Sequence, residues 1–309
     1  MSERVAIVIP TRNGAETLPA LLAGIARGRR RPDEIVAIDS GSTDGTLELL
    51  ASRGVRSVQI PPAEFDHGGT RNQGIAATSA ELVVLLVQDA VPVGERWLEA
   101  LLSPLLSDAT VAGSFARQVP RPGASVVTRR NLACYAATSQ EARVSSIDSA
   151  ERFRRMDPMA RYLACLFDNV CSCVRRAVWQ SHPFPRARFA EDVEWARDVL
   201  LLGHRIAFAP EAVVEHSHER SARYELGRAY LAHARLHALF GLRTIPTLGH
   251  LGVAIATTMA HHARWLREEP APPRELLRAL ELAVALPLGQ YLGARASATG
   301  TELLRPRGI

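Results

Sequence analysis

The chain has 309 residues, of which 47% are hydrophobic and 22% charged, so it can bury a substantial core in one large domain or two small ones. This composition is typical of a folded protein rather than of an intrinsically disordered one. The formal net charge is +5 and the sequence contains no lysine, but the arginines are scattered and only 6% of the residues are aromatic. We expect no nucleic-acid partner, because single strands are bound by aromatic side chains interleaved with basic ones.

Cysteine usage and hydropathy both indicate a cytoplasmic protein. The four cysteines are expected to be free thiols, and the spacing of Cys171 and Cys173 is too tight for the usual zinc pairings. The apolar run at residues 5–10 is too short for a signal peptide. Residues 245–260 are uncharged but contain Gly, His and Thr, so we expect a buried or interfacial helix there rather than a membrane span.

Strand and helix patterns alternate regularly through the first third of the chain. Short apolar runs predict strands at residues 5–9, 34–38, 55–60 and 82–87. Helical spacing predicts helices at residues 17–26, 44–53, 68–79 and 97–106. Strands that are apolar on both faces and alternate with helices predict an α/β fold with a mostly parallel central sheet flanked by helices.

The rest of the chain is less regular. Residues 191–202 read as a helix that Gly203 ends, and short strands are expected at 206–209 and 212–215. From Ser221 onward the sequence predicts helices, interrupted by prolines at 270–273. We therefore expect three parts, at residues 1–110, 111–220 and 221–309.

Polar residues follow three of the predicted strands, and ligands of parallel sheets bind at the carboxyl ends of the strands. Residues 10–13, 39–44 and 88–89 are therefore expected on one rim. Asp39, at a strand end, can accept hydrogen bonds from a nucleotide base or ribose. Ser42, Thr43 and Asp44 can cap the next helix, and for Asp44 we favour capping as its whole role.

Residues 65–72, Phe-Asp-His-Gly-Gly-Thr-Arg-Asn, form a loop that runs into a predicted helix. Glycine lets the backbone approach a ligand closely, and amides at the start of a helix favour an anion. Arg71 can clamp a phosphate. An ordinary tight turn would explain the same glycines.

Asp89 follows the apolar run at 82–87 and can coordinate a divalent ion, although a strand-end cap would explain it as well. One acid binds a metal weakly, so a further ligand is needed. His216 and His218 can supply it, because alternate residues of an extended segment face the same way. We interpret the other histidines of the helical tail as surface or packing residues.

Glu191 and Asp192 open the predicted helix at 191–202. The helix dipole by itself favours acids in a first turn. In an enzyme, one of the two carboxylates would deprotonate an attacking hydroxyl.

Taken in order, these motifs resemble glycosyltransferase family 2, and within it the bacterial rhamnosyltransferases. The resemblance covers roughly the first 220 residues. The matching segments are residues 11–14, 39–46, 65–74, 88–92, 189–196 and 216–218. The usual Asp-x-Asp of such transferases has lost its first acid, since Val87 stands in its place. In the rhamnosyl branch this departure is usual.

The resemblance implies a GT-A nucleotide-sugar-binding fold with a C-terminal helical region. It implies inversion at the anomeric carbon by direct displacement, with Asp192 as base and Glu191 as its neighbour. It implies Mg²⁺ or Mn²⁺ held by Asp89 and by His216 or His218. Asp168, Asn169 and Trp195 are expected on the acceptor side. The nucleotide sugar is expected to contact Pro10, Thr11, Arg12, Asn13, Asp39, Ser42, His67, Gly68, Arg71, Gln88 and Asp89.

The favoured hypothesis is transfer of L-rhamnose from dTDP-L-rhamnose to a glycan or lipid-linked acceptor in cell-surface polysaccharide synthesis. The alternatives are a UDP- or GDP-sugar donor with the same chemistry, and a non-catalytic protein that binds sugar nucleotides. The helical region from Ser221 is expected either to rest on the inner face of the cell membrane or to pack as a soluble domain or homodimer interface.

Overall fold

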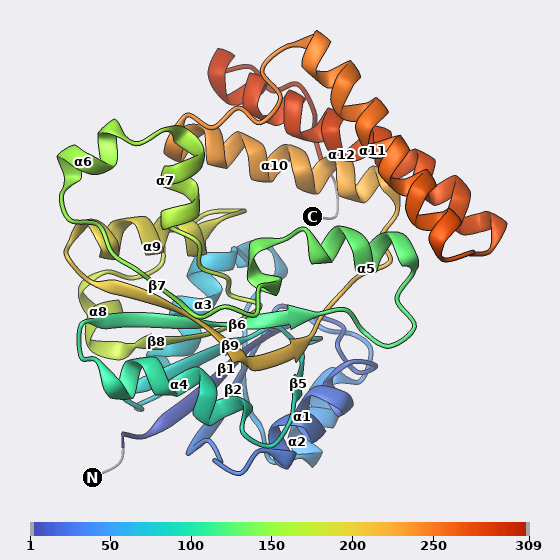
Figure 1. Cartoon of the computed structure of the whole chain (residues 1–309). Coiled ribbons are helices and arrows are strands. Elements are labelled where there is room, and N and C mark those ends of the chain that lie inside the picture. The colour runs from blue at the N-terminus through green and yellow to red at the C-terminus, as the bar shows by residue number, and fades with distance from the viewer. Residues whose placement is uncertain (1–2, 307–309) are drawn as a thin grey trace. The chain divides into compact units, whose positions relative to one another are not determined.

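The computed structural model describes residues 3–306, which group into two compact units (Figure 1). The first unit comprises residues 3–119, 136–155 and 164–216. The second comprises residues 120–135, 156–163 and 217–306. The helical part therefore takes in two segments from the middle of the chain, in addition to the tail expected from Ser221.

A nine-stranded sheet forms the centre of the first unit, in the order β3-β2-β1-β4-β8-β6-β9-β5, with β7 paired to β9. The first four strands in this order, β3, β2, β1 and β4, are all parallel to their neighbours in this group, as expected. The strands are β1 (Val5–Thr11), β2 (Glu34–Asp39), β3 (Arg56–Gln59), β4 (Leu82–Leu86), β5 (Val91–Val93), β6 (Val111–Val119), β7 (Arg143–Ser145), β8 (Cys171–Arg175) and β9 (Arg205–Glu215).

The other half of the sheet is mixed. Strand β8 runs antiparallel to both β4 and β6, and β9 is parallel to β6 but antiparallel to β5 and β7. The two short strands expected near residues 206–215 are one strand, β9, whose register against β6 shifts between Ala209 and Val213. The strands of this mixed half come from the part of the sequence in which the alternation or runs of apolar residues that predict strands are weakest.

Seven α-helices of the first unit and two short 3₁₀ turns connect these strands. They are α1 (Leu18–Arg27), α2 (Thr46–Ser52), α3 (His67–Ala76), α4 (Trp97–Ser107), α6 (Ala150–Arg155), α8 (Arg176–Ser181), α9 (Glu191–Leu201), η1 (Pro62–Glu64) and η2 (Ala136–Thr138).

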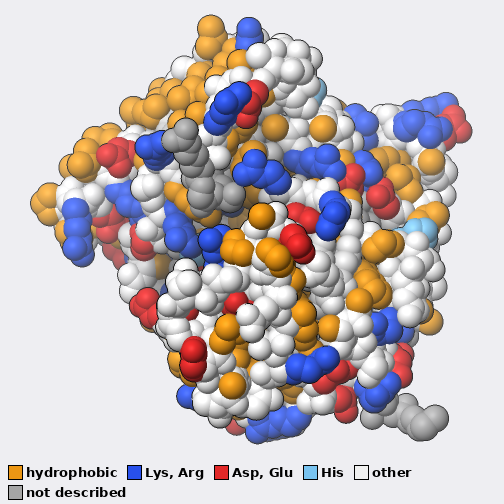
Figure 2. Space-filling model, turned by 180° about the vertical axis from the view of Figure 1, so that it is seen from behind, with side chains coloured by type: hydrophobic (Ala, Val, Ile, Leu, Met, Phe, Trp, Pro, Cys, Tyr) orange, Lys and Arg blue, Asp and Glu red, His pale blue; other side chains and the backbone are white. Residues whose placement is uncertain are grey.

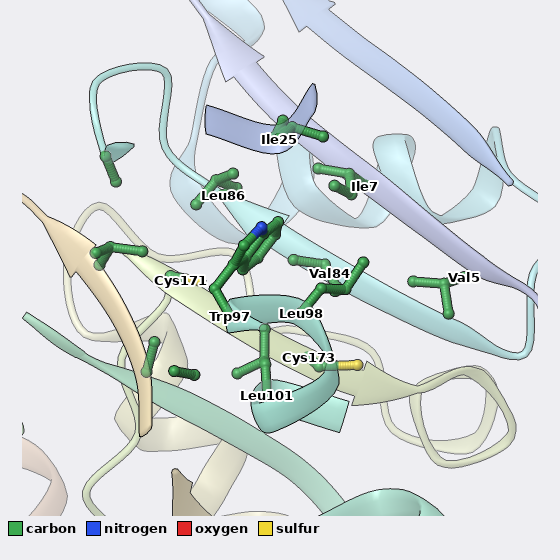
Figure 3. Packing of buried hydrophobic residues seen from close by; sticks show 14 of the residues in the cluster. Val5, Ile7, Ile25, Val84, Leu86, Trp97, Leu98, Leu101, Cys171 and Cys173 are labelled. Atoms are coloured by element: carbon green, nitrogen blue, oxygen red, sulfur yellow. The ribbon is translucent and has the colours of Figure 1, made fainter. Parts of the chain in front are cut away.

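Helices α1 and α4 cover one face of the sheet and form its main hydrophobic core (Figure 3). Trp97 and Leu98 of α4 are 1% and 0% exposed, and they pack over Val84 of β4. Burying a side chain of this size stabilises the fold by about 1.5–3 kcal/mol. The buried thiols of β8, such as Cys173, belong to the same core, and all four cysteines are free thiols, as expected.

Helix α3 packs on the face of the sheet opposite to α1 and α4. It contacts Val8 and Ile38, whose side chains point to this face because successive residues of a strand point to opposite sides. A Cβ atom added to Gly74 would lie 2.2 Å from Cγ1 of Val8 and 3.2 Å from Cγ1 of Ile38. Only glycine permits this approach of α3 to β1 and β2. The contact fixes the position of the motif at residues 65–72.

The second unit consists of α5 (Val126–Ala133), α7 (Pro158–Ala164), α10 (Ala222–Phe240), α11 (Leu248–Glu268) and α12 (Pro273–Thr299). Two glycines of α12 allow close packing against α10: a Cβ on Gly293 would lie 2.2 Å from the carbonyl oxygen of Tyr230. Helix α11 packs on α12, where buried His262 bonds the carbonyl oxygen of Ala279 through Nδ1 at 2.8 Å. Among residues 3–306, no helix is long and apolar enough to cross a membrane.

Candidate active site

The carboxyl ends of β1, β2 and β4 lie side by side, because β1 pairs in parallel with both neighbours. The register places Thr11 beside Asp39. The loops that follow these strands therefore meet at one rim, as the sequence predicted.

The buried carboxylate of Asp39 holds the loop after β2 in place through hydrogen bonds. Asp39 is 0% exposed, and its carboxylate accepts hydrogen bonds from the Thr11 hydroxyl at 3.1 Å and from the backbone of Gly41 at 3.1 Å and Ser42 at 2.9 Å. The hydroxyl of Ser42 also donates to it. These bonds shape the turn. Asp39 therefore holds the loop, and its direct contact with a nucleotide stays a prediction.

The loop after β1 is joined to its two neighbours by side-chain bonds. Asn13, which has a left-handed backbone with φ of 47°, donates from its backbone to Ser42 Oγ at 2.8 Å. Gln88 bonds both sides of Arg12, accepting from its amide at 2.8 Å and donating to its carbonyl oxygen at 3.0 Å. Pro10 and Gln88 are half-buried, whereas the side chains of Arg12 and Asn13 are exposed at the rim.

Asp44 precedes Gly45, the N-cap of α2, and it bonds both the start of that helix and the loop after β1, so capping is not its whole role. Its carboxylate accepts hydrogen bonds from the backbone of Thr46 at 3.2 Å, at the start of α2, and from the backbone of Ala15 at 3.0 Å. The Thr46 side chain also donates to it, and these bonds lower the pKa of the exposed Asp44 carboxyl.

Asp89 and His216 form a pair at the end of β9. Strand β5 begins two residues after Asp89 and runs antiparallel to β9, with Val91 opposite Glu215, so Asp89 is brought beside the residue that follows β9. The Oδ1 atom of Asp89 lies 3.7 Å from Nε2 of His216, and the two side chains are 16% and 14% exposed. A carboxylate oxygen and an imidazole nitrogen at this separation can both reach one divalent ion at about 2.0–2.2 Å.

His218 follows His216 by two residues, at the point where the chain enters the second unit. Its ring offers one more ligand atom for a divalent ion, in addition to those of Asp89 and His216. The other histidines of the helical tail are surface or packing residues, as expected: His261 is exposed, whereas His237 lies 3.0 Å from the hydroxyl of Ser297.

Gln118, near the end of β6, is a site residue that sequence reasoning missed. It is 5% exposed, its Nε2 donates to Oδ2 of Asp168 at 2.6 Å, and its Oε1 lies 2.9 Å from Nδ1 of His216. A buried glutamine in a strand is a signal of a polar network. The signal could not be used, because the sequence did not reveal β6 as a strand.

Asp192 lies in the first turn of α9, two residues after Ala190, whose backbone is left-handed with φ of 56°. Its carboxylate accepts hydrogen bonds from the backbone of Val193 at 2.8 Å and of Asn169 at 3.3 Å. Burial raises the pKa of Asp192 well above its ordinary value, and the nearby carboxylates of Glu191 and Asp168 raise it further. A half-buried carboxylate with increased proton affinity is suited to act as a base.

The carboxylate of Glu191 is held in place by Arg71 and Asn169. Arg71 Nη1 lies 3.1 Å from Glu191 Oε1, and Asn169 Nδ2 donates to the same oxygen at 3.2 Å. Asn169 is itself held by the hydroxyl of Ser172 at 2.8 Å. Arg71 is 5% exposed and also donates to the carbonyl oxygen of His67 at 3.0 Å. The guanidinium therefore pairs with Glu191, and its contact with a phosphate stays a prediction.

The motif at residues 65–72, most of which forms the start of α3, also supports the segment that leads into α9. A Cβ atom on Gly68 would lie 1.9 Å from the carbonyl oxygen of Pro185, so only glycine fits there. Asn72 exchanges two hydrogen bonds with the backbone of Phe184, at 2.8 and 3.0 Å. His67 is half-buried, and burial together with the charge of Arg71 lowers its pKa. These contacts join the motif to the chain just before the two acids.

Trp195, expected on the acceptor side, is a core residue. It is 1% exposed and lies between Phe167 and Phe184, with ring centroids 5.1 and 5.0 Å away. Its Nε1 donates to the carbonyl oxygen of His182 at 2.8 Å. The helical periodicity of α9 turns this position inward, away from any ligand, whereas half-buried Asp168 and Asp192 keep access to solvent.

Comparison with known proteins identifies the family of this chain. A family model described as glycosyl transferase family 2 matches residues 6–163. The O-antigen chain rhamnosyltransferase RfbN of Salmonella typhimurium is 29% identical over 231 residues, which cover 74% of this chain and 70% of the relative. The O-antigen chain rhamnosyltransferase WbaN of Salmonella anatum is 30% identical over 228 residues, covering 72% of this chain and 69% of the relative.

Solved structures share the fold. Glucosyl-3-phosphoglycerate synthase from Mycobacterium tuberculosis, in complex with Mn²⁺, uridine-diphosphate and glucosyl-3-phosphoglycerate, superimposes with a TM-score of 0.54 at 21% identity. The match covers 80% of this chain and 82% of that one. The similarity supports the GT-A type of fold expected from the sequence.

Proposed function

Because this chain belongs to glycosyl transferase family 2, it is a glycosyltransferase, and we propose that it transfers L-rhamnose from dTDP-L-rhamnose to a glycan or lipid-linked acceptor. The donor sugar is proposed from the two O-antigen chain rhamnosyltransferases that resemble it. The chemistry is proposed from one observation, the half-buried Asp192 carboxylate with its raised pKa at the start of α9.

In this proposal Asp192 is the catalytic base. It accepts the proton of the acceptor hydroxyl while that oxygen attacks the anomeric carbon, and the bond from this carbon to the diphosphate breaks on the opposite side, with inversion. The backbone amides of Asn169 and Val193 aim the carboxylate. Its raised pKa increases its affinity for the proton that it must take. Asp168 is proposed to lie beside the acceptor.

Asp89 and His216 are proposed to hold a divalent cation, with His218 as a further ligand. The mixed nitrogen and oxygen donors favour Mn²⁺ over Mg²⁺, because Mg²⁺ prefers oxygen ligands alone. The ion would neutralise the charge of the leaving diphosphate. We propose that Arg12, Asn13 and the loops held by Asp39 and Gln88 receive the nucleotide.

The helical unit is proposed to make peripheral contact with an anionic lipid surface. Residues 120–135, 156–163 and 217–309 contain 16 arginines and 8 acidic residues, a net charge of +8, whereas the whole chain carries +5. Leu277, Leu280 and Val284 lie on one face of α12 and are 61%, 47% and 38% exposed. Figure 2 shows hydrophobic side chains gathered along the upper-left edge, over the C-terminal helices. The contact would place the enzyme at the inner face of the cell membrane.

Thermal-shift measurements with dTDP, UDP, GDP and their common sugars, each with and without Mn²⁺, test the proposed donor. Binding to the folded state raises the melting temperature by mass action. We expect the largest metal-dependent increase with dTDP species. A preference for UDP or GDP would replace the donor but keep the reaction. If no nucleotide changes the melting temperature, the isolated protein binds none of these donors, and the proposed donor is contradicted.

A further inference from the structure

Gln118 connects the two halves of the candidate active site. Its side-chain amide lies between Asp168, which precedes β8, and His216, which follows β9. The bond to Asp168 Oδ2 measures 2.6 Å, and the contact with His216 Nδ1 measures 2.9 Å. All three residues belong to the first unit.

The chemistry of the amide determines the direction of both bonds. An amide nitrogen only donates, and an amide oxygen only accepts. Turning the Gln118 amide around would place its oxygen 2.6 Å from a carboxylate oxygen, where two acceptors repel each other. The amide oxygen therefore faces His216 and requires a hydrogen on Nδ1 of that ring.

A neutral imidazole carries one hydrogen, so Nδ1–H leaves the lone pair on Nε2. Nε2 is the atom that lies 3.7 Å from Asp89 Oδ1. Histidines that bind metals are usually held in this way by a hydrogen bond to the other ring nitrogen. The Gln118 amide thus prepares His216 as a ligand on the side of Asp89.

We propose that Gln118 is a positioning residue that fixes His216 in the Nδ1–H tautomer for a divalent cation and, with the same amide, holds Asp168 beside the base Asp192. The proposal rests on the metal site and the base of the proposed function. Asp168 is also fixed by the backbone of Val170, which donates to Oδ1 at 2.9 Å. The neutral side chain of Gln118 therefore positions both the cation ligand His216 and the carboxylate of Asp168 without adding charge beside either of them.

The first test is the tautomer of His216 in the full wild-type chain, read from the ¹⁵N chemical shifts of labelled histidine at a pH where the ring is neutral. His216→Ala assigns the signal. We expect the Nδ1–H form, with Nε2 unprotonated. The Nε2–H form in the wild-type protein would overturn the proposal, and this readout needs neither metal nor activity.

The second test is the affinity for Mn²⁺ alone, measured from the electron paramagnetic resonance signal of the free ion. Gln118→Met keeps the volume but loses the acceptor, so we expect roughly 10- to 100-fold weaker binding. Gln118→Glu keeps an acceptor for Nδ1–H, so its Mn²⁺ affinity should stay within about 3-fold of wild type, while its negative charge beside Asp168 lowers the transfer rate.

Ser114→Ala is the matched control, because it removes another buried side-chain bond of β6, to the carbonyl oxygen of Leu101. It should leave Mn²⁺ affinity unchanged. Wild-type affinity in Gln118→Met, or equal weakening in Gln118→Glu, would contradict the proposal. If the wild-type chain binds no Mn²⁺, the proposed metal site fails while the tautomer still decides the role of Gln118.

Discussion

Arg71 Nη1 and Glu191 Oε1 lie 3.1 Å apart, and each side chain is only 6% exposed. This buried ion pair joins α3 to the first turn of α9, immediately before the proposed base. Arg71, which the sequence suggests as a phosphate ligand, therefore also anchors the first turn of α9.

We expect Arg71→Met to destabilise the protein by about 3–5 kcal/mol, because it leaves the Glu191 carboxylate buried without its partner. The double variant Arg71→Met/Glu191→Gln should recover most of this loss, since it removes both charges. Urea unfolding of the two variants measures the difference. Equal stability of the single and double variants would show that the pair is not coupled.

Asp192→Asn should abolish sugar transfer while leaving donor binding nearly unchanged, because asparagine cannot accept the proton. Initial rates and calorimetric donor affinity, measured side by side, check this. Asp198→Asn serves as the comparison, since it changes a more exposed acid of the same helix, whose side chain is 45% exposed, and keeps the base. Turnover near wild type in Asp192→Asn would disprove the assignment of the base.

The raised pKa of Asp192 also predicts how stability changes with pH. Above its ordinary pKa of 3.8 the unfolded chain releases the proton, while the folded chain retains it up to the higher folded-state pKa. The contribution of Asp192 to stability is therefore lost as pH rises through this window. Asp192→Asn has no such loss and should melt at a higher temperature than wild type at neutral pH, with a difference that disappears near pH 4.

Asp44 gives the control of opposite sign, because its pKa is lowered in the folded state. Its contribution is present above 3.8 and is lost as pH falls through the folded-state pKa. Asp44→Asn should therefore melt below wild type at neutral pH, and the difference should narrow in acid. Melting curves that moved in the same direction for both variants would contradict these two pKa shifts.

Asp89→Ala and His216→Ala should each weaken the binding of a nucleoside diphosphate in the presence of Mn²⁺, and change it little in the presence of a chelator. The reason is that each variant removes one proposed ligand of the ion. Isothermal titration calorimetry with and without Mn²⁺ measures the effect, with His237→Ala as a control in the helical unit. Unchanged affinity with Mn²⁺ would remove both residues from the metal site.

Leu277→Glu and Leu280→Glu should reduce sedimentation with vesicles that contain phosphatidylglycerol, because a charge on this exposed face opposes its insertion among lipids. Both side chains are exposed, so little change in melting temperature is expected. Leu106→Glu, at a leucine of α4 that is 48% exposed, is the matched control and should sediment like wild type. A change of oligomeric state without any loss of vesicle binding would identify the face as an interface between copies.

Half of the fold could be predicted because its strands are short apolar runs and each is followed by an amphipathic helix. Strands β1 to β4 and helices α1 to α4 were found in this way. Strand β6 contains Gly113 and Arg117, and β8 reads Cys-Ser-Cys, so neither has a strong local pattern. These strands exist because they pair with distant neighbours, and local periodicity does not encode such pairing.

The sequence by itself indicated the family, the order of the motifs and a set of chemically capable residues, namely Asp89, Asp192 and one of the histidines His216 and His218. These depend on residue type and on position at an element's end, which are local properties. Only the tertiary structure decided that Arg71 pairs with Glu191, that Trp195 is core, and that Gln118 bridges Asp168 and His216. The partners of the Arg71–Glu191, Gln118–Asp168 and Gln118–His216 contacts are 50 to 120 residues apart, so they meet only through packing and sheet register.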